Sequence, residues 1–251
     1  MLGRYEAYMD DIALSSIDPS ILVLNVEHTT PEMNIISANL ANRHGAFITR
    51  KKTNSVGVTI TFEIHEYDTV KRQAICQKVA KWADGAMLKT SDRPGQRLRA
   101  MCSQYPVVNA RDWTAAVTVG FTANALPFWE EENPVNVSFT GTSGSSSVYV
   151  PGNADEALVE VSVTANAASA GFTVVVGSTQ ITITDTIAKD AVVKIEYDDK
   201  LIQSIKKGTT SLLNKRTGAD DLLAKSGEFN TFSYSADANV TVVFTVRGCW
   251  R

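Results

Sequence analysis

The sequence predicts a mainly β protein of two domains, with an α+β N-terminal domain carrying one helix and an antiparallel β-sandwich after it. Three observations lead to this prediction. Apolar and polar residues alternate in many segments, as they do in strands with one face on a core. Helical spacing is clear in one segment only. The composition also changes after Trp129, before a stretch rich in Gly, Ser and Thr.

A helix set among strands occupies the block from Ser55 to Phe128. Alternation over Val56–Ile64 and Val117–Phe121 predicts two strands with one buried face each. Between them, Asp68–Asp84 has helical spacing, with Asp68 or Thr69 as N-cap and Gly85 just beyond the last turn. We expect one stripe of this helix in the core and the opposite face in water. The core stripe is Ile75, Val79 and Trp82, and the solvated side chains are Lys71, Arg72, Lys78 and Lys81.

Residues 1–54 predict short strands and loops. Ile21–Val26 is expected to be a strand, and Pro31–Ile36 a turn into a second short one. Thr49–Asn54 is polar and basic, and we interpret it as a loop that leads into the long strand. After the helix, Leu98–Val108 is predicted to be a further strand.

The second half of the chain predicts an antiparallel sandwich. Phe139–Ser147 is interpreted as a linker or exposed loop because it consists almost entirely of Gly, Ser and Thr. From Val148 onward, short alternating segments recur between turn residues, as in sandwich folds. Asp220–Lys225 suggests a short helix. The domains are therefore placed at residues 1–140 and 141–251, with residues 244–251 either closing the second domain or packing back on the first.

Composition and charge exclude several classes of partner and site. The 251 residues carry a net charge of -3 without a block of like charges, so we expect neither specific nucleic-acid binding nor an anionic membrane surface. The N-terminus lacks the apolar run of a signal peptide, and Ile21–Val26 is too short to span a bilayer. Cys76, Cys102 and Cys249 are far apart and odd in number. They predict no disulfide framework and no metal pair, which fits a reducing cytoplasm.

Catalytic and cofactor motifs were searched for without success. His28, His44 and His65 have no second His at i+4 and no nearby Cys, so a zinc site is not expected. GxSxG, P-loop and GxGxxG patterns do not occur. The acids at Glu196, Asp198 and Asp199 follow a strand, and we interpret them as turn residues. The prediction is a protein without enzymatic activity, metal or cofactor.

The order of these segments resembles the distal tail proteins of long, non-contractile-tailed bacteriophages. The order and spacing carry the resemblance more than any single motif does. In the first half it rests on Asn42–Ala46, Gly57–Ile64, Val79–Trp82 and Ala115–Phe121. Later landmarks are Val150–Asn153, Val193–Asp198, Gly227–Asn230 and Val246–Trp250. The sequence departs from the family pattern at His44, where an acid is common, and at Ala157, where Pro is more usual.

The resemblance implies a structural protein of the virion, located at the tail tip or baseplate and assembled in the cytoplasm of the host bacterium. Proteins of this family form a hexameric ring from N-terminal β-sandwich or barrel domains. The ring joins the tail tube protein to the tail-associated fibre or spike protein. A galectin-like C-terminal sandwich projects outward and can hold receptor-binding proteins. We therefore expect a homo-hexamer with these partners.

A closed head-to-tail ring needs two different complementary patches on each subunit. Three candidates are the open edge of the Val56–Ile64 strand, the helix and the basic loop, since open strand edges are natural sites for pairing between chains. The residues predicted to contact another subunit or the tube are Arg50, Lys51, Lys52, Thr53, Asn54, Lys71 and Arg72.

The alternative function is a carbohydrate-binding or adhesion module that contacts the host surface. Sugar binding requires an aromatic platform beside polar hydrogen-bonding groups. The second domain has no His and a single Trp, Trp250 near its C-terminal end, which disfavours direct glycan binding. The aromatic residues that leave this alternative open are Phe172, Phe229, Phe232 and Tyr234.

Overall fold

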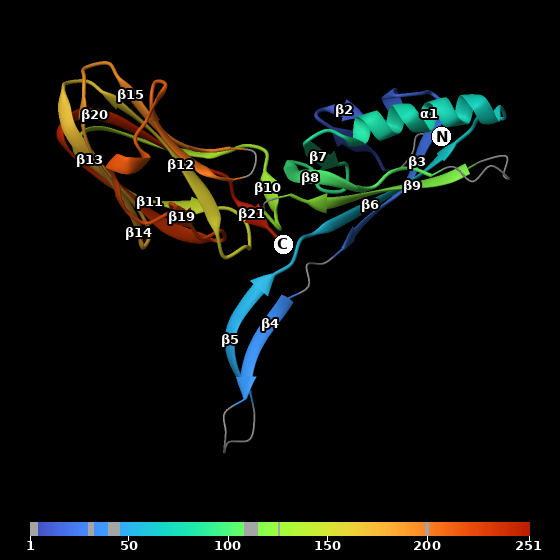
Figure 1. The fold of residues 1–251 in the computed structure, drawn as a ribbon, viewed down its shortest axis with the longest axis horizontal. Coiled ribbons are helices and arrows are strands. Elements are labelled where there is room, and N and C mark those ends of the chain that lie inside the picture. Colours follow the sequence, from blue (N-terminus) through green and yellow to red (C-terminus); the bar gives the residue numbers. More distant parts are fainter. Residues whose placement is uncertain (1–4, 30–32, 40–45, 108–114, 125, 199–200) are drawn as a thin grey trace. The chain divides into compact units, whose positions relative to one another are not determined.

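A computed structural model describes residues 5–29, 33–39, 46–107, 115–124, 126–198 and 201–251. Two large antiparallel sheets and one α-helix make up most of this part of the chain (Figure 1). The predicted fold class, mainly β with a single helix, is therefore confirmed. Within the described ranges, no helix has the length and apolarity needed to cross a membrane.

The chain divides into two compact units, which are described separately. Unit 1 contains residues 1–129 and Arg251, and unit 2 contains residues 130–250. This division lies earlier than the boundary expected between residues 140 and 141. Residues 244–251 were expected either to close the second domain or to pack back on the first. All of them except Arg251 lie in unit 2. Arg251 groups with unit 1, where its guanidinium lies 6.0 Å from the centre of the Phe128 ring.

Unit 1 is built on a sheet with the strand order β2-β1-β7-β8-β9-β6-β3. The strands are β1 (Ala7–Met9), β2 (Ile12–Ala13), β3 (Ile21–Thr29), β6 (Gly57–Ile64), β7 (Met87–Thr90), β8 (Gln96–Gln104) and β9 (Ala115–Ala123), with a 3-10 turn at Leu14–Ser16. The alternation of β6 places Val58, Ile60, Phe62 and Ile64 in the core. The predicted strand at Leu98–Val108 corresponds to β8.

The open edge expected on the Val56–Ile64 strand does not exist. β6 pairs along its length with β3 on one side and with β9 on the other. Both rows of backbone groups are therefore occupied within the sheet. The prediction was wrong because alternation reveals which face of a strand is buried, but not which strands lie beside it.

Helix α1 (Thr69–Ala83) lies on this sheet as predicted. The Asp68 carboxylate accepts hydrogen bonds from the backbone N–H groups of Val70 and Lys71, at 2.8 and 3.4 Å, and so caps the N-terminus. Ile75, Val79 and Trp82 are all buried, which confirms the core stripe. Arg72 was expected in water, but its side chain is buried, so that prediction was wrong.

A separate hairpin follows β3. Its strands, β4 (Met33–Asn39) and β5 (Ala46–Thr53), pair antiparallel and form a two-stranded sheet of their own. The basic segment expected to be a loop is therefore mainly strand. Its Lys and Arg residues concealed the strand because charged residues are depleted in strands generally. The Asn42–Ala46 motif lies outside the described residues except for Ala46.

Unit 2 is organised around two long strands, β11 (Val135–Val150) and β20 (Glu228–Val246). They pair antiparallel from Val135↔Val246 to Val150↔Glu228, with a bulge at Gly141. The linker expected at Phe139–Ser147 is thus the middle of β11, and that prediction was wrong. Its Gly, Ser and Thr residues lie on a strand that β20 holds in register.

On its other side, β20 pairs with β12 along one half and with β13 along the other. The resulting order is β17-β16-β15-β12-β20-β13-β14-β18, with β11 alongside β20 and β19 alongside β12. The remaining strands of this sheet are β12 (Ala157–Ala165), β13 (Ser169–Val176), β14 (Thr179–Ile187), β15 (Val192–Tyr197), β16 (Gln203–Lys207), β17 (Thr210–Ser211), β18 (Arg216–Gly218) and β19 (Leu223–Ala224). Two short strands outside this sheet, β10 (Trp129–Glu131) and β21 (Cys249–Trp250), pair with each other. A 3-10 turn covers Leu213–Lys215, and the short helix expected at Asp220–Lys225 is absent from that described segment, which contains β19 instead.

The two halves of β20 belong to two layers of one sandwich. Phe232 from one half and Phe244 from the other pack edge to face, with ring centres 5.5 Å apart. The predicted antiparallel sandwich is therefore present.

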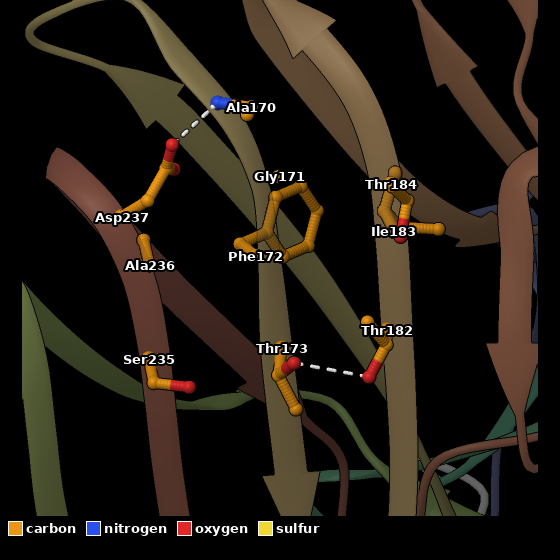
Figure 2. Close-up of a pocket in the computed structure, with 10 residues that line it drawn as sticks. All are labelled: Ala170, Gly171, Phe172, Thr173, Thr182, Ile183, Thr184, Ser235, Ala236 and Asp237. Atoms are coloured by element: carbon orange, nitrogen blue, oxygen red, sulfur yellow. Dashed lines mark hydrogen bonds between the residues drawn. The ribbon is translucent and has the colours of Figure 1, made fainter.

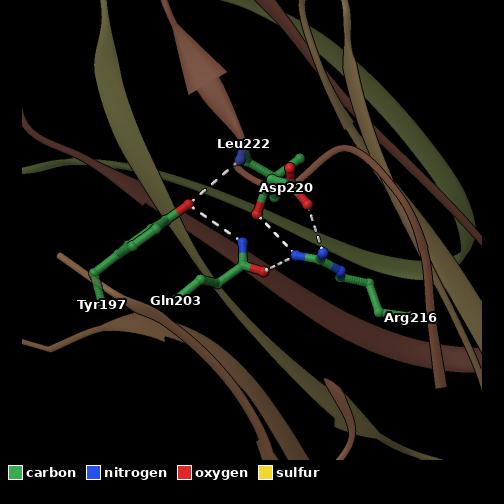
Figure 3. Close-up of polar contacts among 5 residues, drawn as sticks. All are labelled: Tyr197, Gln203, Arg216, Asp220 and Leu222. Carbon is green, nitrogen blue, oxygen red and sulfur yellow. Dashed lines mark hydrogen bonds and ion pairs between the residues drawn. The ribbon is translucent and has the colours of Figure 1, made fainter. Parts of the chain in front are cut away.

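Polar contacts link β16 to β18, which lie near opposite ends of this strand order. Arg216 of β18 donates a hydrogen bond to Gln203 of β16 at 2.7 Å and forms an ion pair with Asp220 (Figure 3).

Candidate assembly interface

The β4–β5 hairpin exposes three isoleucines. Ile35, Ile36 and Ile48 are 50%, 51% and 48% exposed. Neither strand of the hairpin pairs with any other strand in the described part of the chain. A two-stranded hairpin without a second layer is only marginally stable in water. The hairpin therefore presents both apolar side chains and open backbone edges to a partner.

Basic residues lie directly opposite this apolar pair. In the hairpin register, Ile35 faces Lys51 and Ile36 faces Arg50 on the neighbouring strand. Lys52 is opposite Asn34 in the same ladder. Four of the predicted interface residues, Arg50, Lys51, Lys52 and Thr53, are thus consecutive on β5, and the exposed Asn54 follows it. Four of the five therefore lie on one strand, and the fifth directly follows it.

The two predicted residues on the helix differ from each other. Lys71 is exposed in the first turn of α1, whereas Arg72 is only 4% exposed. They lie on a different element from the hairpin. Of these two residues, only Lys71 has a side chain that a partner could contact.

Sequence reasoning missed the apolar half of the hairpin. Ile35 and Ile36 were placed in a turn that leads into a short strand, and Ile48 was not singled out. Two adjacent isoleucines cannot both point into one core from a regular strand, because successive side chains point to opposite faces. That pair was the available signal for a strand that is exposed on at least one face.

A second polar cluster in unit 1 contains a histidine. His28 Nε2 lies 2.6 Å from Asp92 Oδ2, and the imidazole packs edge-on against Trp129 with ring centres 5.3 Å apart. Burial acts to raise the pKa of Asp92, but hydrogen bonds from Thr90 and His28 outweigh it and hold the pKa below its usual value. The contact ties His28 of β3 to Asp92, just beyond β7, and we assign it a structural role.

Other candidate sites from the sequence stay structural. Asp198 accepts a hydrogen bond from the backbone N–H of Ile202 at 2.8 Å, which confirms its turn role. Asp199 lies outside the described residues. In the described ranges, no group of three or more His, Cys, Asp or Glu side chains is arranged to hold a metal ion.

Known proteins match this chain by structure and not by sequence. No family model and no curated protein matches this sequence. By structure, the chain aligns with the Dit protein of phage SPP1 over 97% of this chain and 98% of that one, with a TM-score of 0.67 and 15% sequence identity. The chain has the Dit fold. The SPP1 protein is described as a paradigm of the hub adsorption apparatus in phages that infect Gram-positive bacteria.

The Dit fold of this chain also matches chains of the phage P2 baseplate. Two structures of that baseplate in its activated conformation, one with Ca and one with Sr, align with TM-scores of 0.52 and 0.51. Each match has 8% identity and covers 97% of both chains. The resemblance that the order of segments suggested is confirmed at the level of the fold, across both units.

Proposed function

We propose that this chain is the structural hub of a phage tail tip, acting by assembly without catalysis. The observation that carries the proposal is the match to the SPP1 Dit fold over nearly the full length of both chains. A match to one unit alone would support only a common β module. The proposed location is the virion, at the tail tip or baseplate.

The proposed assembly is a homo-hexameric ring in which the β4–β5 hairpin of one copy contacts the next copy. Such a ring needs a contact between two unlike patches. The hairpin supplies one of them, because it offers half-exposed isoleucines beside open strand edges. Obligate interfaces of this kind bury on the order of 2,000 Å² or more and are apolar at the centre. Arg50, Lys51, Lys52, Thr53 and Asn54 would then border that contact, together with Lys71.

The proposed partners follow from the hub role. One side of the ring would join the tail tube protein, and the other would join the tail-associated fibre or spike protein. Unit 2 would provide the platform for a receptor-binding protein. These partners rest on the family resemblance and on the Dit fold, and the net charge of -3 is consistent with a ring that does not bind nucleic acid tightly.

Charge reversal tests the hairpin contact. Lys51→Glu with Lys52→Glu should reduce assembly of the chain, measured as the mass of the complex in solution, because it replaces two cations by two anions at the proposed contact. The double variant should keep the circular dichroism spectrum and melting temperature of the parent, which shows that any loss of assembly does not come from unfolding.

The matched control is Lys189→Glu with Lys206→Glu, which makes the same change of net charge at exposed positions of unit 2. It should assemble like the parent chain. Unchanged assembly of the Lys51/Lys52 variant would rule out the hairpin contact. Equal loss in both variants would mean that overall charge, not the hairpin, controls assembly.

A further inference from the structure

One outer face of unit 2 consists almost entirely of hydroxyl side chains. The face is formed by β11, β20, β13, β14 and β18, which are neighbours in this order. At one register, Ser143, Ser235, Thr173, Thr182 and Thr217 lie opposite one another on these five strands. The next register adds Ser145, Ser233, Val175 and Gln180. We call this surface the hydroxyl face.

The hydroxyl face carries no charged side chain at any of these registered positions. In a chain with 20% charged residues, an extended outer surface without charge is unusual. Thr has a high β propensity, which accounts for part of the pattern, but Ser does not share that preference. Strand propensity therefore does not explain the face as a whole.

An aromatic pair ends the face. Tyr149 and Phe229 lie opposite each other on β11 and β20, with ring centres 5.5 Å apart. Their side chains are 48% and 73% exposed. Such a pair offers a ligand two adjacent apolar ring faces on which it can stack. Because side chains two residues apart share a face, the pair continues through Ser147 and Thr231 into the hydroxyl rows.

Near the middle of β20, at Ser235–Asp237, the face is hollowed. A shallow pocket of about 350 Å³ lies where β13 diverges from β20, and its lining includes Thr173, Thr182 and Ser235 (Figure 2). Asp237 borders it, and its carboxylate accepts hydrogen bonds from the Ser169 hydroxyl and the Ala170 N–H. The Thr173 and Thr182 hydroxyls are 3.0 Å apart.

We propose that the hydroxyl face binds a neutral polysaccharide, with a sugar ring stacked on Tyr149 and Phe229 and the chain running along β20 toward the pocket. Hydroxyl side chains both donate and accept hydrogen bonds, as sugar hydroxyls do, so each can pair with the other in either sense. The apolar face of a pyranose ring packs on an aromatic ring through C–H contacts.

The charge pattern selects a neutral glycan over the other occupants. An anionic polymer would find no cation in the hydroxyl rows and would meet the Asp237 carboxylate at the pocket. A protein partner fits less well, because Ser is depleted at the centres of protein interfaces. This site lies within unit 2 and does not depend on ring formation.

Binding by the full chain to three soluble neutral probes, a β-linked glucan, a galactan and an N-acetylhexosamine polymer, tests the proposal by isothermal titration calorimetry. At least one probe should bind. Phe229→Ala should weaken that binding about five- to tenfold by removing the stacking surface. Thr173→Lys should weaken it at least as much, because it places a bulky cation in the centre of the hydroxyl face.

Two matched variants control for general effects. Tyr67→Ala removes an exposed aromatic side chain from unit 1, and Thr164→Lys makes the same substitution on β12, whose outer face belongs to the other layer of the sandwich. Both should bind like the parent, and all four variants should keep its melting temperature within a few degrees. The proposal is overturned if no neutral probe binds, if Phe229→Ala and Thr173→Lys bind unchanged, or if the controls lose binding equally. Binding to a phosphodiester-linked anionic polymer alone would also overturn it.

Discussion

At the scale of single residues, Trp82 best illustrates how the sequence encodes the core of unit 1. Its ring packs edge-on against Phe121 of β9, with centres 5.9 Å apart, and its Nε1–H donates to the Ile12 carbonyl at 2.7 Å. One side chain thus ties the helix to two separate strands. The sequence predicted its burial from helical spacing, but the hydrogen bond to Ile12 depends on tertiary placement that spacing does not contain.

Replacing Trp82 by Ala should destabilise the chain by about 3–5 kcal/mol, since it leaves a large cavity and an unpaired carbonyl. Urea unfolding measures the free energy. The control is Val70→Ala on the same helix, at a position 73% exposed, where the change should be about 0.5 kcal/mol or less. A Trp82→Ala variant as stable as the parent would contradict the core assignment.

Ionisation of Tyr197 should lower the stability of unit 2 at alkaline pH. Burial raises the pKa of its phenol to about 12, while Gln203 and the backbone N–H of Leu222 donate to its oxygen (Figure 3). The folded state thus favours the neutral phenol. Its contribution to stability is complete below the ordinary pKa of 10 and is lost as pH rises from about 10 to about 12.

Tyr197→Phe should remove that part of the pH dependence. Denaturant unfolding of the variant should lose less stability than the parent between pH 9.5 and pH 12, roughly, because no phenol is left to ionise. Ultraviolet titration of the folded variant should lack the tyrosine component that titrates latest. If parent and variant lose stability in parallel over this range, Tyr197 is not the group responsible.

At the scale of elements, alternation identified strands reliably when their buried residues were apolar. β6 and β9 were recognised in this way, whereas the helix and its N-cap were recognised from helical spacing and a capping Asp. The segments missed were β5 and β11, which are rich in Lys, Arg or Ser. β5 pairs with β4 of its own hairpin, whereas the partner of β11 is remote in sequence. For β11 that partner is β20, paired from Ser143↔Ser235 to Val150↔Glu228. Such pairing leaves little trace in local composition.

The middle of β11 should resist proteases. Residues 139–147 look like a flexible linker in sequence, but they pair with β20 along their length apart from the bulge at Gly141. Limited proteolysis of the folded chain with a protease of broad specificity, followed by mass spectrometry, should give no early cuts there. Early cleavage within this segment would mean that β11 is not held by β20 in solution.

At the scale of the whole molecule, the order of elements was more informative than any motif. Mainly β character, one helix and two halves were predictable, and so was the resemblance that the Dit fold bears out. The interface could be predicted only in part. The basic residues of β5 stand out in the sequence, whereas the exposure of Ile35 and Ile48 depends on a hairpin that has no second layer. The pairing of Tyr149 with Phe229 likewise joins residues far apart in the chain.

We propose that copies of this chain close into a hexameric ring. Light scattering coupled to size exclusion, performed over a range of concentrations with negative-stain images of the main peak, tests it most directly. The expected result is a mass six times the 27.2 kDa of one chain and a ring with a central hole. A mass of one chain at every concentration, with no rings in the images, would contradict it.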